Sequence, residues 1–199
     1  MLDIWKKALE LGVKEIPKKI QNHSGYLPWH DAWQRDFLIE YKNTGIDLFT
    51  EKRYVDALWI FTHLLELSPD DNQGARFMAV DCCLIIGKDI HAIEICNKYN
   101  STHGPDAHLC YSKSIAMYST YEVESVKEQI KKSISRFPVF GKLLAQKRKK
   151  SFYDSKDFKS PGYIGSEKEE AMSFWNTQGL VWERNNEFME LFRKIYNKN

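Results

Sequence analysis

LIEYKNTGIDLFTEKRYVDALWIFTHLLELSPDD, residues 38–71, is the stretch that decides the fold. It predicts two helices folded into a hairpin, because small residues stand where two antiparallel helices would cross. Gly45 and Ala57 let the two helices approach, and Phe61 fills the space beside the crossing. Pro69 ends the second helix, since proline cannot continue the helical hydrogen-bond ladder.

The same helix–turn–helix rhythm recurs twice along the chain. Ala92 follows Ala57 by 35 residues, and Val126 follows Ala92 by 34. Pro138 follows Pro69 by 69 residues, which is two repeats. Such a period indicates repeated units that stack on one another; an ordinary helical bundle with accidental spacing is the alternative. The expected helices are 29–49 and 54–67, 73–86 and 89–100, and 106–119 and 122–136.

Helices are also expected on both sides of the hairpins. Residues 2–22 carry apolar residues at spacings of three and four, which predicts an amphipathic helix. Further helices are expected at 139–150, 167–176 and 180–196, with a break at 177–179. The predicted organisation is one helical-repeat domain, 1–199, with an N-terminal capping helix and loop (1–28), three hairpins (29–140), a basic helix end and loop (141–165) and C-terminal capping helices (166–199).

Several residues mark where these helices begin or end. Asp71 or Asn72 is expected to cap the helix that follows the first hairpin. Gly87 suits the C-terminal end of the next helix, because glycine adopts the left-handed conformation required there. Ser166 and Glu169 have the spacing of a capping box, which predicts a helix start.

Composition narrows the class of protein. The net charge of +2 is too small to indicate nucleic-acid binding by itself. No apolar run approaches the ~20 residues that a membrane-spanning helix needs, and the N-terminus lacks a signal-peptide pattern. We therefore expect a cytoplasmic protein with no membrane partner. Its four cysteines fall in helix-like segments and are expected to be reduced and packed as small hydrophobes.

The repeat landmarks resemble the tetratricopeptide pattern. This pattern places a large residue, a small pair ending in glycine and another large residue before an alanine, an aromatic residue and a closing proline. The matching residues are Tyr41, Thr44, Gly45, Leu48, Ala57, Phe61, Leu64 and Pro69. More narrowly, segments 67–76, 136–144 and 161–171, the last followed by Trp175, resemble poorly characterised bacterial tetratricopeptide proteins related to a suppressor-of-tumorigenicity-like repeat family. The resemblance implies an all-α, right-handed superhelix of about three hairpins and no catalytic residues.

In such an array the first helix of each hairpin lines a concave groove, where aromatic walls and polar anchors suit a bound peptide or helix. We therefore expect a non-catalytic scaffold that binds a protein or peptide. The alternative is that the terminal helices fill this groove and make its aromatic residues part of the core. The candidate binding residues are Lys42, Phe49, Phe77, Asp81, His108, Tyr111 and Tyr118.

A basic stretch at residues 142–159 supports a second hypothesis. It carries seven positive charges against two negative ones, with Phe152, Tyr153 and Phe158 interleaved. Basic residues follow phosphates and aromatic rings stack on bases, so single-stranded nucleic acid is the alternative partner. A solvated helix end and loop explains the same residues more simply. The residues that would contact nucleic acid are Lys147, Arg148, Lys149 and Lys150.

The sequence shows no pattern that indicates an enzyme. Its histidines and cysteines lack the spacings of metal sites, and its glycines do not form a phosphate-binding loop. We therefore expect no cofactor and no metal. A second copy of the chain is a further possible partner, because the ends of a short helical stack expose apolar surface.

Overall fold

The computed structural model describes residues 25–146 and 166–198, apart from the side chain of Trp33. The chain divides into two compact units, Met1–Cys82 and Cys83–Asn199, and we describe each by itself. The described residues form helices and no strand, which confirms the all-α prediction. The helices are α2 (Ala32–Thr50), α3 (Tyr54–Leu67), α4 (Ala75–Ile85), α5 (Asp89–Thr102), α6 (Ala107–Tyr118), α7 (Val123–Arg136), α8 (Pro138–Ala145), α9 (Glu167–Arg184) and α10 (Asn186–Tyr196).

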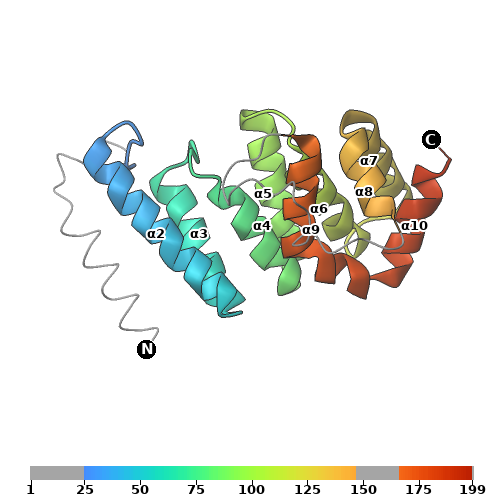
Figure 1. Cartoon of the computed structure of the whole chain (residues 1–199), viewed down its shortest axis with the longest axis horizontal. Coiled ribbons are helices and arrows are strands. Elements are labelled where there is room, and N and C mark those ends of the chain that lie inside the picture. Colours follow the sequence, from blue (N-terminus) through green and yellow to red (C-terminus); the bar gives the residue numbers. More distant parts are fainter. Residues whose placement is uncertain (1–24, 147–165, 199) are drawn as a thin grey trace. The chain divides into compact units, whose positions relative to one another are not determined.

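The first unit contains the predicted hairpin of α2 and α3, which lie side by side (Figure 1). Gly45 of α2 faces the buried ring of Phe61 so closely that a Cβ atom there would lie 2.7 Å from Cε1 of the ring. Ala57 is fully buried in α3. Helix α3 ends at Leu67, two residues before Pro69. Gly45 and Ala57 are therefore small because the two helices pack closely at these positions, as predicted.

Asp71 holds the start of α4, as predicted. Its carboxylate accepts hydrogen bonds from the backbone N–H groups of Ala75 at 2.6 Å and Arg76 at 3.1 Å. The guanidinium of Arg76 donates to the same carboxylate at 2.8 Å. Because Asp71 is 4% exposed, these groups replace the water that a surface carboxylate would bind.

The second unit is organised around α6. Helices α5 and α7 pack on α6, and α9 packs on both α6 and α8. Figure 1 shows α9 running beside α6 and α10 beside α7 and α8. Two bonds tie these helices to α8: Glu167 accepts a hydrogen bond from the backbone N–H of Phe140 at 3.1 Å, and Arg193 donates to the carbonyl of Ala145 at 3.2 Å.

The predicted break at residues 177–179 is wrong, because α9 runs unbroken from Glu167 to Arg184. Gly179 lies inside the helix, where an added Cβ atom would meet the indole of Trp175 at 2.8 Å. The glycine is thus needed for close packing rather than for a turn. The helix changes direction at Asn185, whose side chain accepts a hydrogen bond from the N–H of Phe188 and caps α10.

Two other predicted helix boundaries are confirmed, and one predicted helix is shorter than expected. Gly87 follows α4 with a φ of +74°, and Ser166 caps α9 by accepting a hydrogen bond from the N–H of Glu169. The helix predicted at 139–150 ends at Ala145. The predicted capping helix at 2–22 lies outside the described residues.

The cysteines behave as small core residues. Cys82, Cys83, Cys96 and Cys110 are all free and buried, as predicted. Burial raises the pKa of the Cys83 thiol to about 12, so this side chain stays neutral. Among the described helices, none is long and apolar enough to cross a membrane.

Candidate binding surfaces

Tyr111, a predicted groove residue of α6, lies in the core of the second unit. Its side chain is fully buried and its hydroxyl donates to the carbonyl of Phe137 at 2.9 Å. Its ring stacks on Phe140 with centroids 5.0 Å apart, and the rings of Trp182 and Phe192 complete its surroundings. Tyr111 therefore offers no exposed surface to a partner.

The other two predicted groove residues of α6 also meet the C-terminal helices. The imidazole of His108 contacts the ring of Phe174 edge-on, with centroids 4.9 Å apart. The hydroxyl of Tyr118 donates to a carboxylate oxygen of Glu187 at 3.3 Å, and its ring lies beside Phe188. For this hairpin the C-terminal helices contact the residues that were expected to line a groove.

A buried polar group fixes the position of α9 on α6. The amide nitrogen of Gln178 donates to the hydroxyl of Ser112 at 2.6 Å and lies 3.2 Å from Nε2 of His108. The amide oxygen of Gln178 accepts from the indole N–H of Trp182 at 3.3 Å. A buried amide with partners on both its donor and acceptor sides specifies one register, because any slip would leave polar groups without partners.

Glu170 stands at the edge of this contact between α6 and α9. Burial raises the pKa of its carboxyl group, and the neighbouring Asp106 raises it further. The His108 side chain and backbone N–H act in the opposite direction. The Glu170 carboxylate thus lies near the start of α6 in surroundings that disfavour its charged form.

In the first unit, Lys42 and Phe49 have partners within the unit. The Lys42 ammonium group donates to the carbonyl of Gln73 at 2.7 Å, and burial lowers the pKa of this lysine. The ring of Phe49 contacts that of Tyr54 edge-on, with centroids 5.2 Å apart. Between them, Ile46 is 36% exposed, as is Ile39 one turn before Lys42. This face of α2 therefore keeps an apolar surface open in the described structure.

The predicted binding residues of α4 have different environments. Phe77 is half-buried, and the guanidinium of Arg76 lies 4.2 Å from the centre of its ring. Asp81 is fully buried. Phe77 thus keeps some surface for contact, whereas Asp81 cannot act as a surface anchor.

The remaining predictions concern charge and metals. Lys147, Arg148, Lys149 and Lys150 lie outside the described residues. Within the described ranges, no group of three or more His, Cys, Asp or Glu side chains is placed to hold a metal ion. A cationic cleft that is formed by α5, α6 and α7 was not predicted from the sequence. Its local signal in the sequence is the set of Lys131, Lys132 and Arg136 on α7.

Comparison with known proteins adds no relative from which a function could be carried over. The chain matches no protein-family model, no curated protein and no solved structure.

Proposed function

We propose that the chain is a non-catalytic scaffold that binds a helix or extended segment of another protein on the face of α2 that carries Ile39 and Ile46. The observation that carries the proposal is the exposure of these two isoleucines, each at 36%, on a helix that also packs against α3. These residues are seven apart, so they lie two turns from each other on one face. A partner that covers both side chains removes their exposed apolar area from water, which favours binding.

The neighbours of the two isoleucines suit an apolar contact. Lys42 lies between them in the sequence, but its ammonium group is bound to the carbonyl of Gln73. Its aliphatic stem then extends the apolar surface, and its charge does not compete for the partner. Phe49, half-buried against Tyr54, adds an aromatic edge one turn beyond Ile46. We assign contact area to the isoleucines and Phe49.

We also propose that the hairpins belong to a tetratricopeptide-like array. Support comes from the tight contact of Gly45 with Phe61 and from the recurrence of helix pairs at the predicted places. In this reading α9 and α10 fill the binding face of the third hairpin. The proposed site is therefore confined to the first unit, around α2 and the half-buried Phe77 of α4.

The test compares two double variants that each remove two exposed apolar side chains. Ile39→Ser with Ile46→Ser removes the proposed contact, while Val55→Ser with Ile90→Ser removes residues that are 64% and 55% exposed on other helices. Each protein is coupled to a resin and exposed to nuclease-treated extract of its own cells, and bound proteins are quantified by mass spectrometry. A partner retained by the wild type and the control, but lost from the first variant, is the expected result.

Two outcomes would contradict the proposal. Equal retention by both variants would show that α2 does not make the contact. Light scattering that shows a dimer of the wild type, dissolved only by the Ile39 and Ile46 substitutions, would assign the face to a second copy of the chain. Circular dichroism of both variants checks that the helices remain folded.

A further inference from the structure

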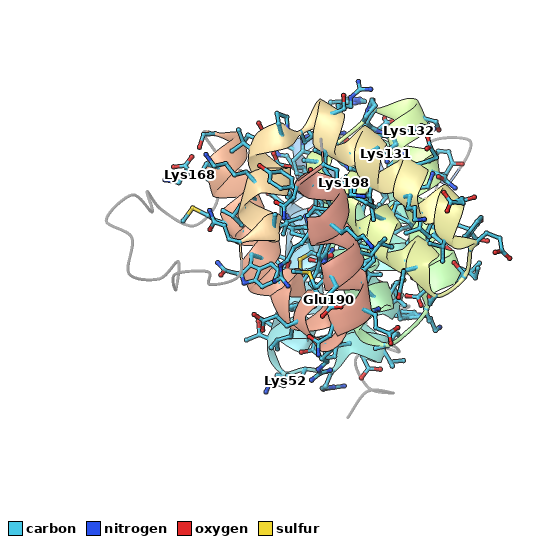
Figure 2. The ribbon with its side chains drawn as sticks, turned by 90° about the vertical axis from the view of Figure 1, so that its right-hand side faces the viewer. Lys52, Lys131, Lys132, Lys168, Glu190 and Lys198 are labelled. Atoms are coloured by element: carbon cyan, nitrogen blue, oxygen red, sulfur yellow. The ribbon has the colours of Figure 1, made fainter. Side chains whose placement is uncertain are left out.

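A cationic cleft lies in the second unit, between α5, α6 and α7. Its volume is about 850 Å³. Four positively charged residues line it, Lys113 from α6 and Lys131, Lys132 and Arg136 from α7, and no acidic or aromatic residue does. Figure 2 shows Lys131 and Lys132 next to each other on α7. Such a gathering of like charges raises the free energy of the unit unless an anion occupies the cleft.

The cleft is separate from the face of α6 that α9 covers. An α-helix turns by about 100° per residue, so Cys110 and Lys113 lie on the opposite side of α6 from His108 and Tyr111. The cleft is therefore open while α9 is in place. Its contacts are independent of the aromatic core around Tyr111.

The cations of the cleft differ in how far they are already neutralised. Lys131 forms an ion pair with Glu128 at 3.3 Å. No carboxylate of the described residues forms an ion pair with Lys113, Lys132 or Arg136. Three charges are thus available to an incoming anion.

Two of these cations, Arg136 and Lys113, lie close enough to the Cys110 thiol to affect its pKa. Burial raises the pKa of this thiol and Asp106 raises it further, while Arg136 and Lys113 act against both. The side chain of Asp106 accepts a hydrogen bond from the N–H of Leu109 as the cap of α6. That carboxylate is therefore held at the helix start rather than in the cleft.

We propose that this cleft binds an acidic peptide segment of a partner protein, with Lys113, Lys132 and Arg136 pairing with its carboxylates. The positive charge of the cleft favours an anionic ligand. The uncharged residues of its lining favour a peptide over a nucleic acid. The amide side chain of Asn97 has both a donor and an acceptor group, which suits a peptide backbone. The amide oxygen of Asn100 accepts a hydrogen bond from the backbone N–H of Asp106 at 3.0 Å, so this side chain adds donor groups. A phosphate backbone offers acceptors only, and the cleft has no aromatic ring on which a base could stack.

The probe is a fluorescein-labelled peptide of eight glutamates, titrated with the full chain and followed by fluorescence anisotropy at low salt. The test variant is Lys113→Gln with Lys132→Gln and Arg136→Gln. The control is Lys88→Gln with Lys168→Gln and Lys194→Gln, which changes the net charge equally at exposed sites just before α5 and on α9 and α10. Figure 2 shows Lys168 at the opposite edge of the second unit from Lys132.

We expect the Kd to rise at least about tenfold in the cleft variant, since each ion pair contributes a factor of about two to four. The control should stay within about twofold of the wild type, and binding should weaken as salt is added. Equal weakening in both variants, or no binding of the peptide by the wild type at about 1 mM protein, overturns the proposal. Tighter cleft-dependent binding of a labelled eight-nucleotide thymidine strand would assign the cleft to nucleic acid instead. The Ile39 and Ile46 substitutions leave the cleft unchanged, so the result is independent of the proposed site on α2.

Discussion

Replacing Gly45 by alanine tests the reason given for the α2–α3 hairpin. The new Cβ atom would lie 2.7 and 2.8 Å from Cε1 and Cζ of Phe61, and 3.0 Å from Cγ2 of Ile60. Carbon atoms in contact prefer separations of about 3.5–4.0 Å. Phe61 is fully buried and Ile60 is 2% exposed, so neither side chain can move into solvent.

Two opposing terms set the size of the effect. Overpacking of a core costs about 1–3 kcal/mol. Alanine is favoured over glycine inside a helix by about 0.5–1 kcal/mol, because glycine loses more backbone entropy on folding. The crowding term is the larger one, and we expect Gly45→Ala to lower the free energy of unfolding by about 1 kcal/mol. In a helix free of contacts the same change would raise it.

Phe61→Leu provides the control, because leucine lacks the ring atoms that the new Cβ would meet. In that background Gly45→Ala should become neutral or stabilising, as a double-mutant cycle would show. Thr44→Ala, at the neighbouring position of the same helix, should change stability by less than about 0.5 kcal/mol.

The assay is urea unfolding followed by circular dichroism, with hydrogen exchange of α2 and α3 amides to report on the first unit alone. A Gly45→Ala variant more stable than the wild type would refute the argument. So would a cost that persists in the Phe61→Leu background, because the ring would then not be its source.

Three further substitutions probe other contacts. Asp71→Ala removes the carboxylate that holds the start of α4 and pairs with Arg76, and should cost about 1–3 kcal/mol in urea unfolding; Asp71→Asn, which keeps an acceptor, should cost less. Gln178→Leu takes away the acceptor of the Trp182 indole N–H and should cost about 1–3 kcal/mol, seen as faster exchange of α9 amides. The pKa of Glu170 is raised in the folded state, so its penalty is absent at acid pH and grows as pH rises through the ordinary carboxyl range. Glu170→Gln should therefore raise the melting temperature at pH 7 and leave it nearly unchanged at pH 3; an equal effect at both pH values would contradict this.

Local signals in the sequence predicted the hairpins well. The bounds of α3 agree with the prediction. Pro69 ends the helix through its own backbone, and Gly45 and Ala57 allow two helices that are consecutive in the sequence to pack closely. Ser166 and Asp71 also cap their helices as predicted, since a cap depends only on the next few residues. The signals fail where tertiary packing overrides them. The sequence around Gly179 is typical of a helix break, but this glycine lies inside α9 and lets the indole of Trp175 pack against the helix.

The candidate site was harder to predict than the helices. Nothing within α6 indicates that Tyr111 faces Trp182 and Phe192, because these residues are far along the chain. The pattern that predicts a groove residue and the pattern that predicts a core residue are the same: an aromatic side chain on the inner face of a helix. The cationic cleft was missed for a similar reason, since Lys113 and Arg136 meet only after α6 and α7 have paired.

The bond between Gln178 and Ser112 spans 66 residues, and this separation has a consequence for synthesis of the chain. The hairpin of α6 and α7 is complete once Arg136 has been made, but Trp182 and Phe192, which complete the surroundings of Tyr111, arrive only with α9 and α10. At about 5–20 residues per second, the face of α6 waits several seconds for its cover. During that interval a nascent chain presents a large aromatic surface to chaperones and to other chains. Whether the aromatic face of α6 becomes covered thus depends on the docking of α9 and α10, which are made well after the hairpin.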